Sequence, residues 1–172
     1  MSVFNFVYYR EHGGLGRGPF AEPPFHVFKH LGDRKWLAQQ PQHWFLASGW
    51  GQPFVKPTPL PRKIAPGQTE AFTLDLAPPT GGWKHAGRLR IQGEDSLSES
   101  RWTARLNGDP LTPTDDVSEP YPNPYPPMLG KPDEMRAWTV SAALLRDGPN
   151  KLEFVLDSSP RLTLAYLDLA IS

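Results

Sequence analysis

The fold is decided by residues 137–172, which read AWTVSAALLRDGPNKLEFVLDSSPRLTLAYLDLAIS. In residues 151–157, apolar side chains alternate with mainly charged ones, which predicts a strand with one buried and one solvated face. Residues 162–171 are apolar at both phases of the alternation. Such a strand is covered on both faces or changes phase at a bulge. We therefore expect it at the centre of a sheet, with upstream segments as its neighbours.

The composition favours one domain built of short strands. The chain has 172 residues, enough for a core and a small appendage. It contains 21 Pro and 15 Gly, but also 6 Trp, 9 Phe and 5 Tyr, so it has enough aromatic surface to fold. This combination is typical of strands joined by Pro-rich loops and disfavours a helical bundle.

The charge and cysteine content exclude several classes of partner. The 18 basic and 18 acidic residues cancel and form no long runs, so we expect neither a nucleic acid nor a membrane as partner. The absence of Cys excludes disulfides, thiol nucleophiles and thiolate metal sites. No signal-peptide pattern or membrane span is evident in this chain. The cellular compartment stays undecided, and a secreted parent protein is one of the alternatives.

Residues 1–52 differ from the rest and are expected to form an N-terminal appendage. A β-prone aromatic run over residues 3–9 leads into a Gly-rich loop. Helical spacing of Phe25, Phe28 and Leu31 then predicts a short helix. The β domain is expected to span residues 53–172, entered through a Pro-rich stretch.

Alternating segments at residues 72–76, 89–91 and 102–106 each predict a strand with one solvated face. Asn107-Gly108 predicts a two-residue hairpin turn because both residues tolerate positive φ. A short return strand from Leu111 and a long loop over residues 112–132 are expected to follow. The predicted fold class is mainly β, a jelly-roll β-sandwich of two packed sheets.

Two motifs occur in a recognisable order within residues 69–172: a strand ending in Leu106-Asn107-Gly108, and a corner with the pattern Gly148-x-Asn150 before another strand. Together they resemble the galactose-binding-like jelly-roll domains at the C-terminus of bacterial glycoside hydrolases. The resemblance implies that the corner serves the fold, with Gly148 in a left-handed turn that Asn150 ties together.

The sequence VFNFVYYREHG and the helix after it resemble the last strand and closing helix of a (β/α)8 barrel from the same kind of hydrolase. On this resemblance, we expect the chain to lack the earlier barrel strands that would supply catalytic carboxylates. The cluster Arg10, Glu11 and His12 has no second carboxylate at a readable spacing, so no catalytic residue is assigned.

Candidate ligand-binding residues lie in two loops. Sugar rings stack on aromatic side chains while polar groups bind their hydroxyls. The first loop supplies Trp83 and His85, and the second supplies Tyr121, Asn123 and Tyr125. The alternative is that these aromatic side chains only fill their own loops. Two further residues, Trp102 and Trp138, lie in phase with the strand cores and are expected to be structural.

No metal or cofactor is predicted from the histidines. His26 and His30 are four residues apart but lack the Glu of the zincin signature. A structural Ca²⁺ stays open, because such ions are common in the jelly rolls that this chain resembles; its candidate ligands are Asp109, Asp115 and Asp116.

The resemblance favours a non-catalytic carbohydrate-binding accessory module of a glycoside hydrolase, which recognises a glycan weakly by aromatic stacking. One alternative is a structural domain that braces a catalytic barrel and forms a homo-oligomer through the aromatic residues of the N-terminal segment. Another is a glycoside hydrolase fragment with residual activity. The identity of the sugar and the oligomeric state stay open.

Overall fold

The computed structural model describes residues 33, 42–47, 59–79, 81–118, 131–158 and 160–171. The chain divides into two compact units: Pro41–Ser118 with Leu129–Ser172, and Met1–Gln40 with Glu119–Met128. Apart from Asp33, all described residues belong to the first unit. The strand and helix expected in residues 1–40 lie outside the described residues. In the part of the chain that the structure describes, no helix is long and apolar enough to cross a membrane.

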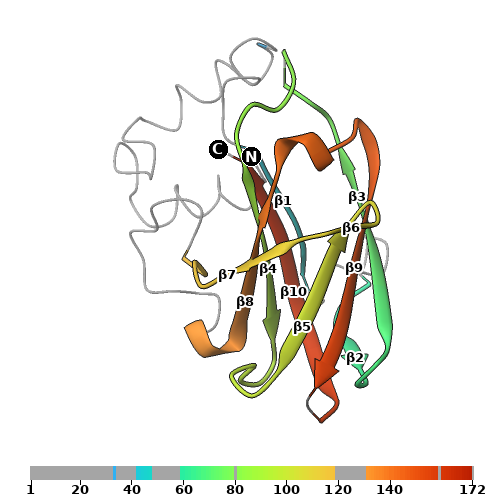
Figure 1. The fold of residues 1–172 in the computed structure, drawn as a ribbon, viewed down its shortest axis with the longest axis vertical. Helices are drawn as coiled ribbons and strands as arrows, with labels where there is room; N and C mark the ends of the chain where they lie inside the picture. Colours follow the sequence, from blue (N-terminus) through green and yellow to red (C-terminus); the bar gives the residue numbers. More distant parts are fainter. Residues whose placement is uncertain are drawn as a thin grey trace, which may run out of the picture. The chain divides into compact units, whose positions relative to one another are not determined.

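Two antiparallel sheets form a β-sandwich (Figure 1). The six-stranded sheet has the order β1-β10-β4-β8-β7, with β2 also pairing with β10; its strands are β1 (Gln42–Ala47), β2 (Arg62–Ile64), β4 (Gly87–Gly93), β7 (Thr112–Thr114), β8 (Met135–Val140) and β10 (Leu162–Ile171). The four-stranded sheet has the order β3-β9-β5-β6, from β3 (Thr69–Leu76), β5 (Arg101–Leu106), β6 (Asp109–Pro110) and β9 (Gly148–Ser158). The two helices among the described residues are 3-10 turns, η1 (Pro132–Glu134) and η2 (Ala142–Leu144). The predicted mainly β sandwich is confirmed.

Strand β10 has the central place that its sequence predicts. It pairs with β1 and β2 on one side and with β4 on the other. Its register with β4 shifts between Leu164 and Tyr166. Beyond this bulge, Leu167 and Leu169 belong to the core between the sheets, so Asp168 between them points to the opposite face. Both features expected of a strand apolar at two phases, central placement and a bulge, are therefore present.

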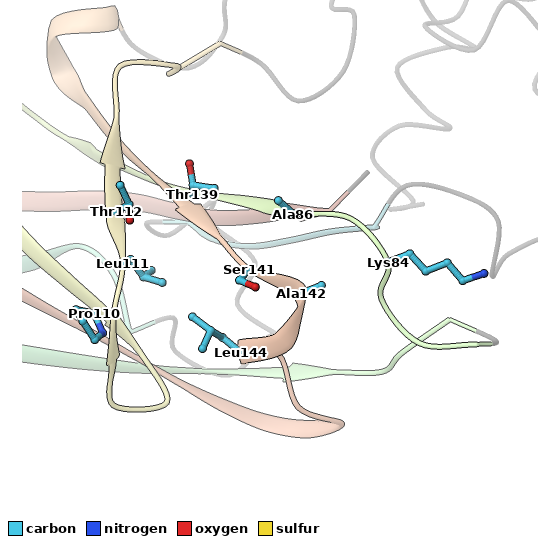
Figure 2. Close-up of a pocket in the computed structure, with 9 residues that line it drawn as sticks. All are labelled: Lys84, Ala86, Pro110, Leu111, Thr112, Thr139, Ser141, Ala142 and Leu144. Carbon is cyan, nitrogen blue, oxygen red and sulfur yellow. The ribbon is translucent and has the colours of Figure 1, made fainter.

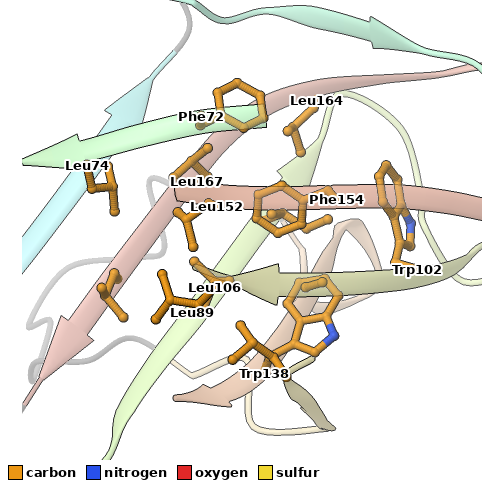
Figure 3. Close-up of a cluster of buried hydrophobic side chains, with 14 of the residues drawn as sticks. Phe72, Leu74, Leu89, Trp102, Leu106, Trp138, Leu152, Phe154, Leu164 and Leu167 are labelled. Carbon is orange, nitrogen blue, oxygen red and sulfur yellow. The ribbon is translucent and has the colours of Figure 1, made fainter. Parts of the chain in front are cut away.

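The core lies between the two sheets (Figure 3). In β3 the buried residues alternate strictly with exposed ones, as predicted for a strand with one wet face. The Phe154 ring of β9 packs against Phe72 at a centroid distance of 6.0 Å and against Trp138 at 5.7 Å. Each large apolar side chain buried in this way stabilises the fold by about 1.5–3 kcal/mol.

The two core tryptophans differ in their hydrogen bonding. The indole N–H of Trp102 donates to Ser100 Oγ at 2.7 Å. The Nε1 atom of Trp138 is buried and has no hydrogen-bond partner among the described residues. Both side chains are buried, which confirms their expected structural role.

The predicted turns form and are tied to each other. Asn107 and Gly108 adopt φ of 54° and 95° in the hairpin between β5 and β6, and Gly148 adopts 83° at the corner where β9 begins. The side-chain amide of Asn150 donates to the carbonyl oxygens of Arg146 at 2.6 Å and Gly148 at 2.9 Å. Its oxygen accepts the Asn107 amide at 2.9 Å. The corner asparagine therefore also holds the neighbouring hairpin.

Two strands, β1 and β7, lie in segments for which the sequence predicted an appendage and a loop. β1 falls within residues 1–52, yet it pairs with β10 along its whole length, from Gln42↔Ile171 to Ala47↔Tyr166. β7 occupies the start of the loop expected over residues 112–132, because Thr112, Pro113 and Thr114 pair with β8. Both pairings join residues far apart in the sequence, which local patterns do not reveal.

Candidate functional site: an open groove beside the Trp83 loop

A groove of about 510 Å³ opens where β8 leads into η2 (Figure 2). Three separate segments line it: the loop before β4, the connection from β6 to β7, and the turn after β8. Its lining combines hydroxyl and aliphatic side chains, namely Thr112, Thr139, Ser141, Ala86, Pro110, Leu111, Ala142 and Leu144, together with Lys84.

The hydroxyl groups of the groove stand on regular structure. Thr112 of β7 and Thr139 of β8 are register partners. Ser141 is the N-cap of η2, and its Oγ accepts the Ala143 amide at 3.3 Å. Each hydroxyl can both donate and accept a hydrogen bond, which suits a ligand rich in hydroxyls. Their backbone positions are set by strand pairing and a capped turn rather than by a free loop.

The groove has little charge among its described lining residues. Lys84 is the one ionisable residue there. Figure 2 shows its side chain extending away from Ser141 and Ala142. The lining therefore offers neutral hydrogen-bonding groups and aliphatic surface, which suits an uncharged, amphipathic ligand.

The first predicted ligand loop adjoins this groove. Trp83 is half-buried and packs against the hydrophobic core. Its indole N–H donates to Gln42 Oε1 at 2.9 Å. His85 is exposed, and Lys84 between the two lines the groove. Binding by Trp83 and His85 stays a prediction.

The second predicted ligand loop, with Tyr121, Asn123 and Tyr125, lies outside the described residues, and so does the Arg10, Glu11 and His12 cluster. Their roles also stay predictions.

A buried ionic network lies on the outer face of the six-stranded sheet, the face turned away from the other sheet. Arg90 and Asp168 are both fully buried and form a bidentate pair, with Nε to Oδ1 at 3.0 Å and Nη2 to Oδ2 at 2.5 Å. The hydroxyl of Tyr166 donates to Asp168 Oδ2 at 3.0 Å. Arg90 Nη1 also donates to the carbonyl oxygens of Val117 at 3.1 Å and Ser118 at 2.9 Å.

The solvated face predicted for β4 is therefore wrong at Arg90. Alternation places this side chain opposite to Leu89 and Ile91, but it is buried there, and it is bonded to Asp168 and to carbonyl oxygens. One sequence signal was available: Asp168 is the single charged residue within the apolar run at residues 162–171. A charge in such a strand requires a partner, because an unpaired buried carboxylate is costly.

Arg88, two residues before Arg90 on β4, contacts the same segment, residues 116–118. It forms an ion pair with Asp116, and its Nη2 donates to Ser118 O at 2.6 Å. Hydrogen bonds from Ser118, with the attraction of Arg88, lower the pKa of Asp116 below its usual value. Asp116 is thus occupied by partners inside the chain. No group of three or more His, Cys, Asp or Glu among the described residues could hold a metal ion, so the Ca²⁺ hypothesis for Asp109 and Asp115 gains no support there.

Comparison with known proteins gives structural matches only. No family model and no curated protein matches the chain. A β-porphyranase of glycoside hydrolase family 86 from the human gut bacterium Bacteroides plebeius matches with 11% identity and a TM-score of 0.45, over 76% of this chain and 20% of the enzyme. The enzyme BuGH86 in complex with neoagarooctaose matches with 11% identity and a TM-score of 0.42, over 76% of this chain and 18% of the enzyme. The chain thus spans about a fifth of the length of these enzymes, and the resemblance concerns the fold.

Proposed function

We propose that this chain is a non-catalytic accessory module that binds a neutral carbohydrate weakly in the groove beside the Trp83 loop. The observation that carries the proposal is the lining of that groove, which includes three hydroxyl residues together with several aliphatic ones. A sugar ring has the complementary character, with C–H faces that prefer apolar contact and hydroxyls that need hydrogen-bond partners. An open groove also leaves much of a bound sugar in water, which is consistent with weak binding.

The residues predicted from the sequence would extend this surface. Trp83, which is half-buried, would offer the exposed part of its ring, and the exposed His85 would offer a hydrogen-bonding ring nitrogen. Tyr121, Asn123 and Tyr125 belong to the proposal as a second contact loop on the sequence argument alone.

The proposal is tested by affinity electrophoresis through a panel of neutral polysaccharides, followed by titration calorimetry with an oligosaccharide of any that retards the protein. Thr139→Val removes one groove hydroxyl at nearly constant shape. It avoids Ser141, whose hydroxyl also caps η2. Loss of one hydrogen bond worth about 1 kcal/mol should weaken binding about fivefold.

The matched control is Thr73→Val on β3, an equally exposed strand threonine outside the groove. It should bind like the wild type. No retardation by any polysaccharide would refute the function, and equal affinity of the two variants would refute the groove as the binding site.

A further inference from the structure

A single glutamine joins the Trp83 loop, the segment at residues 77–86 between β3 and β4, to strand β1. Gln42 begins β1, and its backbone is held in register opposite Ile171. Its side-chain oxygen accepts the Trp83 indole N–H at 2.9 Å. Its side-chain nitrogen lies 3.4 Å from the carbonyl oxygen of Ala77, to which it donates. The same amide therefore contacts both Ala77, the first residue of the segment between β3 and β4, and Trp83 in its second half.

The Trp83 loop has few other restraints among the described residues. Gly81 and Gly82 adopt φ of 91° and 76°, which side-chain-bearing residues rarely adopt. A Cβ at Gly82 would meet nothing within 4 Å. One turn hydrogen bond, from Gly82 N to Pro79 O at 2.9 Å, closes the loop. The backbone alone thus leaves the orientation of the Trp83 ring open.

The core contact and the Gln42 hydrogen bond together determine that orientation. Packing against the core fixes the depth of the indole ring, and the N–H bond selects the edge that faces β1. The indole ring then has a defined orientation in the loop. A ring ordered before binding loses less side-chain freedom when a ligand stacks on it.

We infer that Gln42 is a positioning residue, which orders the Trp83 ring for stacking against a neutral saccharide. The inference rests on the proposed function and extends it to a residue on another strand. The ligand class follows from the geometry, since an ordered indole ring beside a groove of mainly neutral lining residues fits the C–H face of a sugar ring. Gln42 itself need not touch the sugar.

Three variants test this inference. Gln42→Met removes both hydrogen bonds with a side chain of similar size. Gln42→Glu keeps an acceptor for the indole N–H. The control, Gln92→Met, changes a half-buried glutamine of β4 outside this loop. The indole N–H resonances are recorded in ¹H–¹⁵N spectra, with the Trp83 signal assigned by its loss in Trp83→Phe. Saccharide affinity is measured on the same samples.

We expect Gln42→Met to move the Trp83 indole resonance toward that of a free indole N–H and to weaken saccharide binding about three- to tenfold. Gln42→Glu should retain the resonance and most of the affinity, and Gln92→Met should change neither. The inference is overturned if Gln42→Met leaves the resonance or the affinity unchanged, or if Gln42→Glu is as impaired as Gln42→Met.

The two proposals fail in different ways. A wild-type protein that binds no saccharide refutes the proposed function and the binding role of Gln42 together, while the indole resonance still shows whether Gln42 holds the ring. Binding that depends on Trp83 but not on Gln42 refutes the positioning role alone.

Discussion

Replacing Asp168 by Asn should destabilise the sandwich more than an ordinary surface substitution would. The change keeps the size of the side chain but removes the charge that neutralises Arg90. Both residues are fully buried, and their two contacts are 3.0 and 2.5 Å long. Breaking a buried ion pair and leaving one charge uncompensated costs about 3–5 kcal/mol. That is a large part of the roughly 5–15 kcal/mol that stabilises a typical domain.

Urea unfolding followed by tryptophan fluorescence measures this effect. With a slope near 2 kcal/mol per molar urea, typical of a small domain, the midpoint should fall by about 1.5–2.5 M. Tyr166→Phe serves as the milder comparison, because it removes one hydrogen bond to the same carboxylate and should cost about 1.5–3 kcal/mol.

The double variant Arg90→Met with Asp168→Leu separates charge from packing. It removes both charges together, so no unpaired ion remains, and apolar replacements of buried ion pairs are often neutral or stabilising. It should therefore be more stable than Asp168→Asn alone. A loss below about 1 kcal/mol in Asp168→Asn, or a double variant as unstable as the single one, would refute the assignment of the pair as a buried, mutually neutralising unit.

Two further predictions concern single groups. Trp138→Phe should destabilise the protein less than Trp102→Phe in the same urea assay. The reason is that the Trp138 N–H has no partner among the described residues, whereas the Trp102 N–H is hydrogen-bonded to Ser100. The reverse order would contradict the hydrogen-bond assignment. Asp116→Asn should lower the melting temperature at pH 7 but not at low pH. The folded-state pKa of Asp116 lies below its unfolded value of about 3.9, so its contribution is present above that pH and is lost as the pH falls through the folded pKa. A stability difference that stays constant between pH 7 and pH 2 would contradict this.

Local pattern was sufficient for the elements of the sandwich. The alternation in residues 72–76 predicted a half-buried strand, and β3 buries the expected side. Asn107-Gly108 predicted a hairpin because both residues tolerate positive φ, and both adopt it. Such features depend on the side-chain period and on backbone sterics, which neighbouring residues determine between them.

The candidate site could be predicted only in part. The loop with Trp83 was identified because an aromatic side chain follows two glycines, but its partner Gln42 lies on another strand, and the amide has no sequence feature that marks it. The groove is made by three segments that strand pairing brings together, with Thr112 opposite Thr139. Register between distant strands sets these contacts, and a shift of β7 by one residue would turn Thr112 to the other face.

The chain's residue pattern alone was enough to establish two packed sheets, a central final strand and the turns that connect them, because burial and φ preferences act over a few residues at a time. The side on which Asp168 lies was decided by the bulge after Leu164, and the charge that it needed came from Arg90 on a different strand. Pairing across the sheet is a property of the assembled fold. Because of this pairing, Arg90, which alternation assigns to solvent, is a buried structural group.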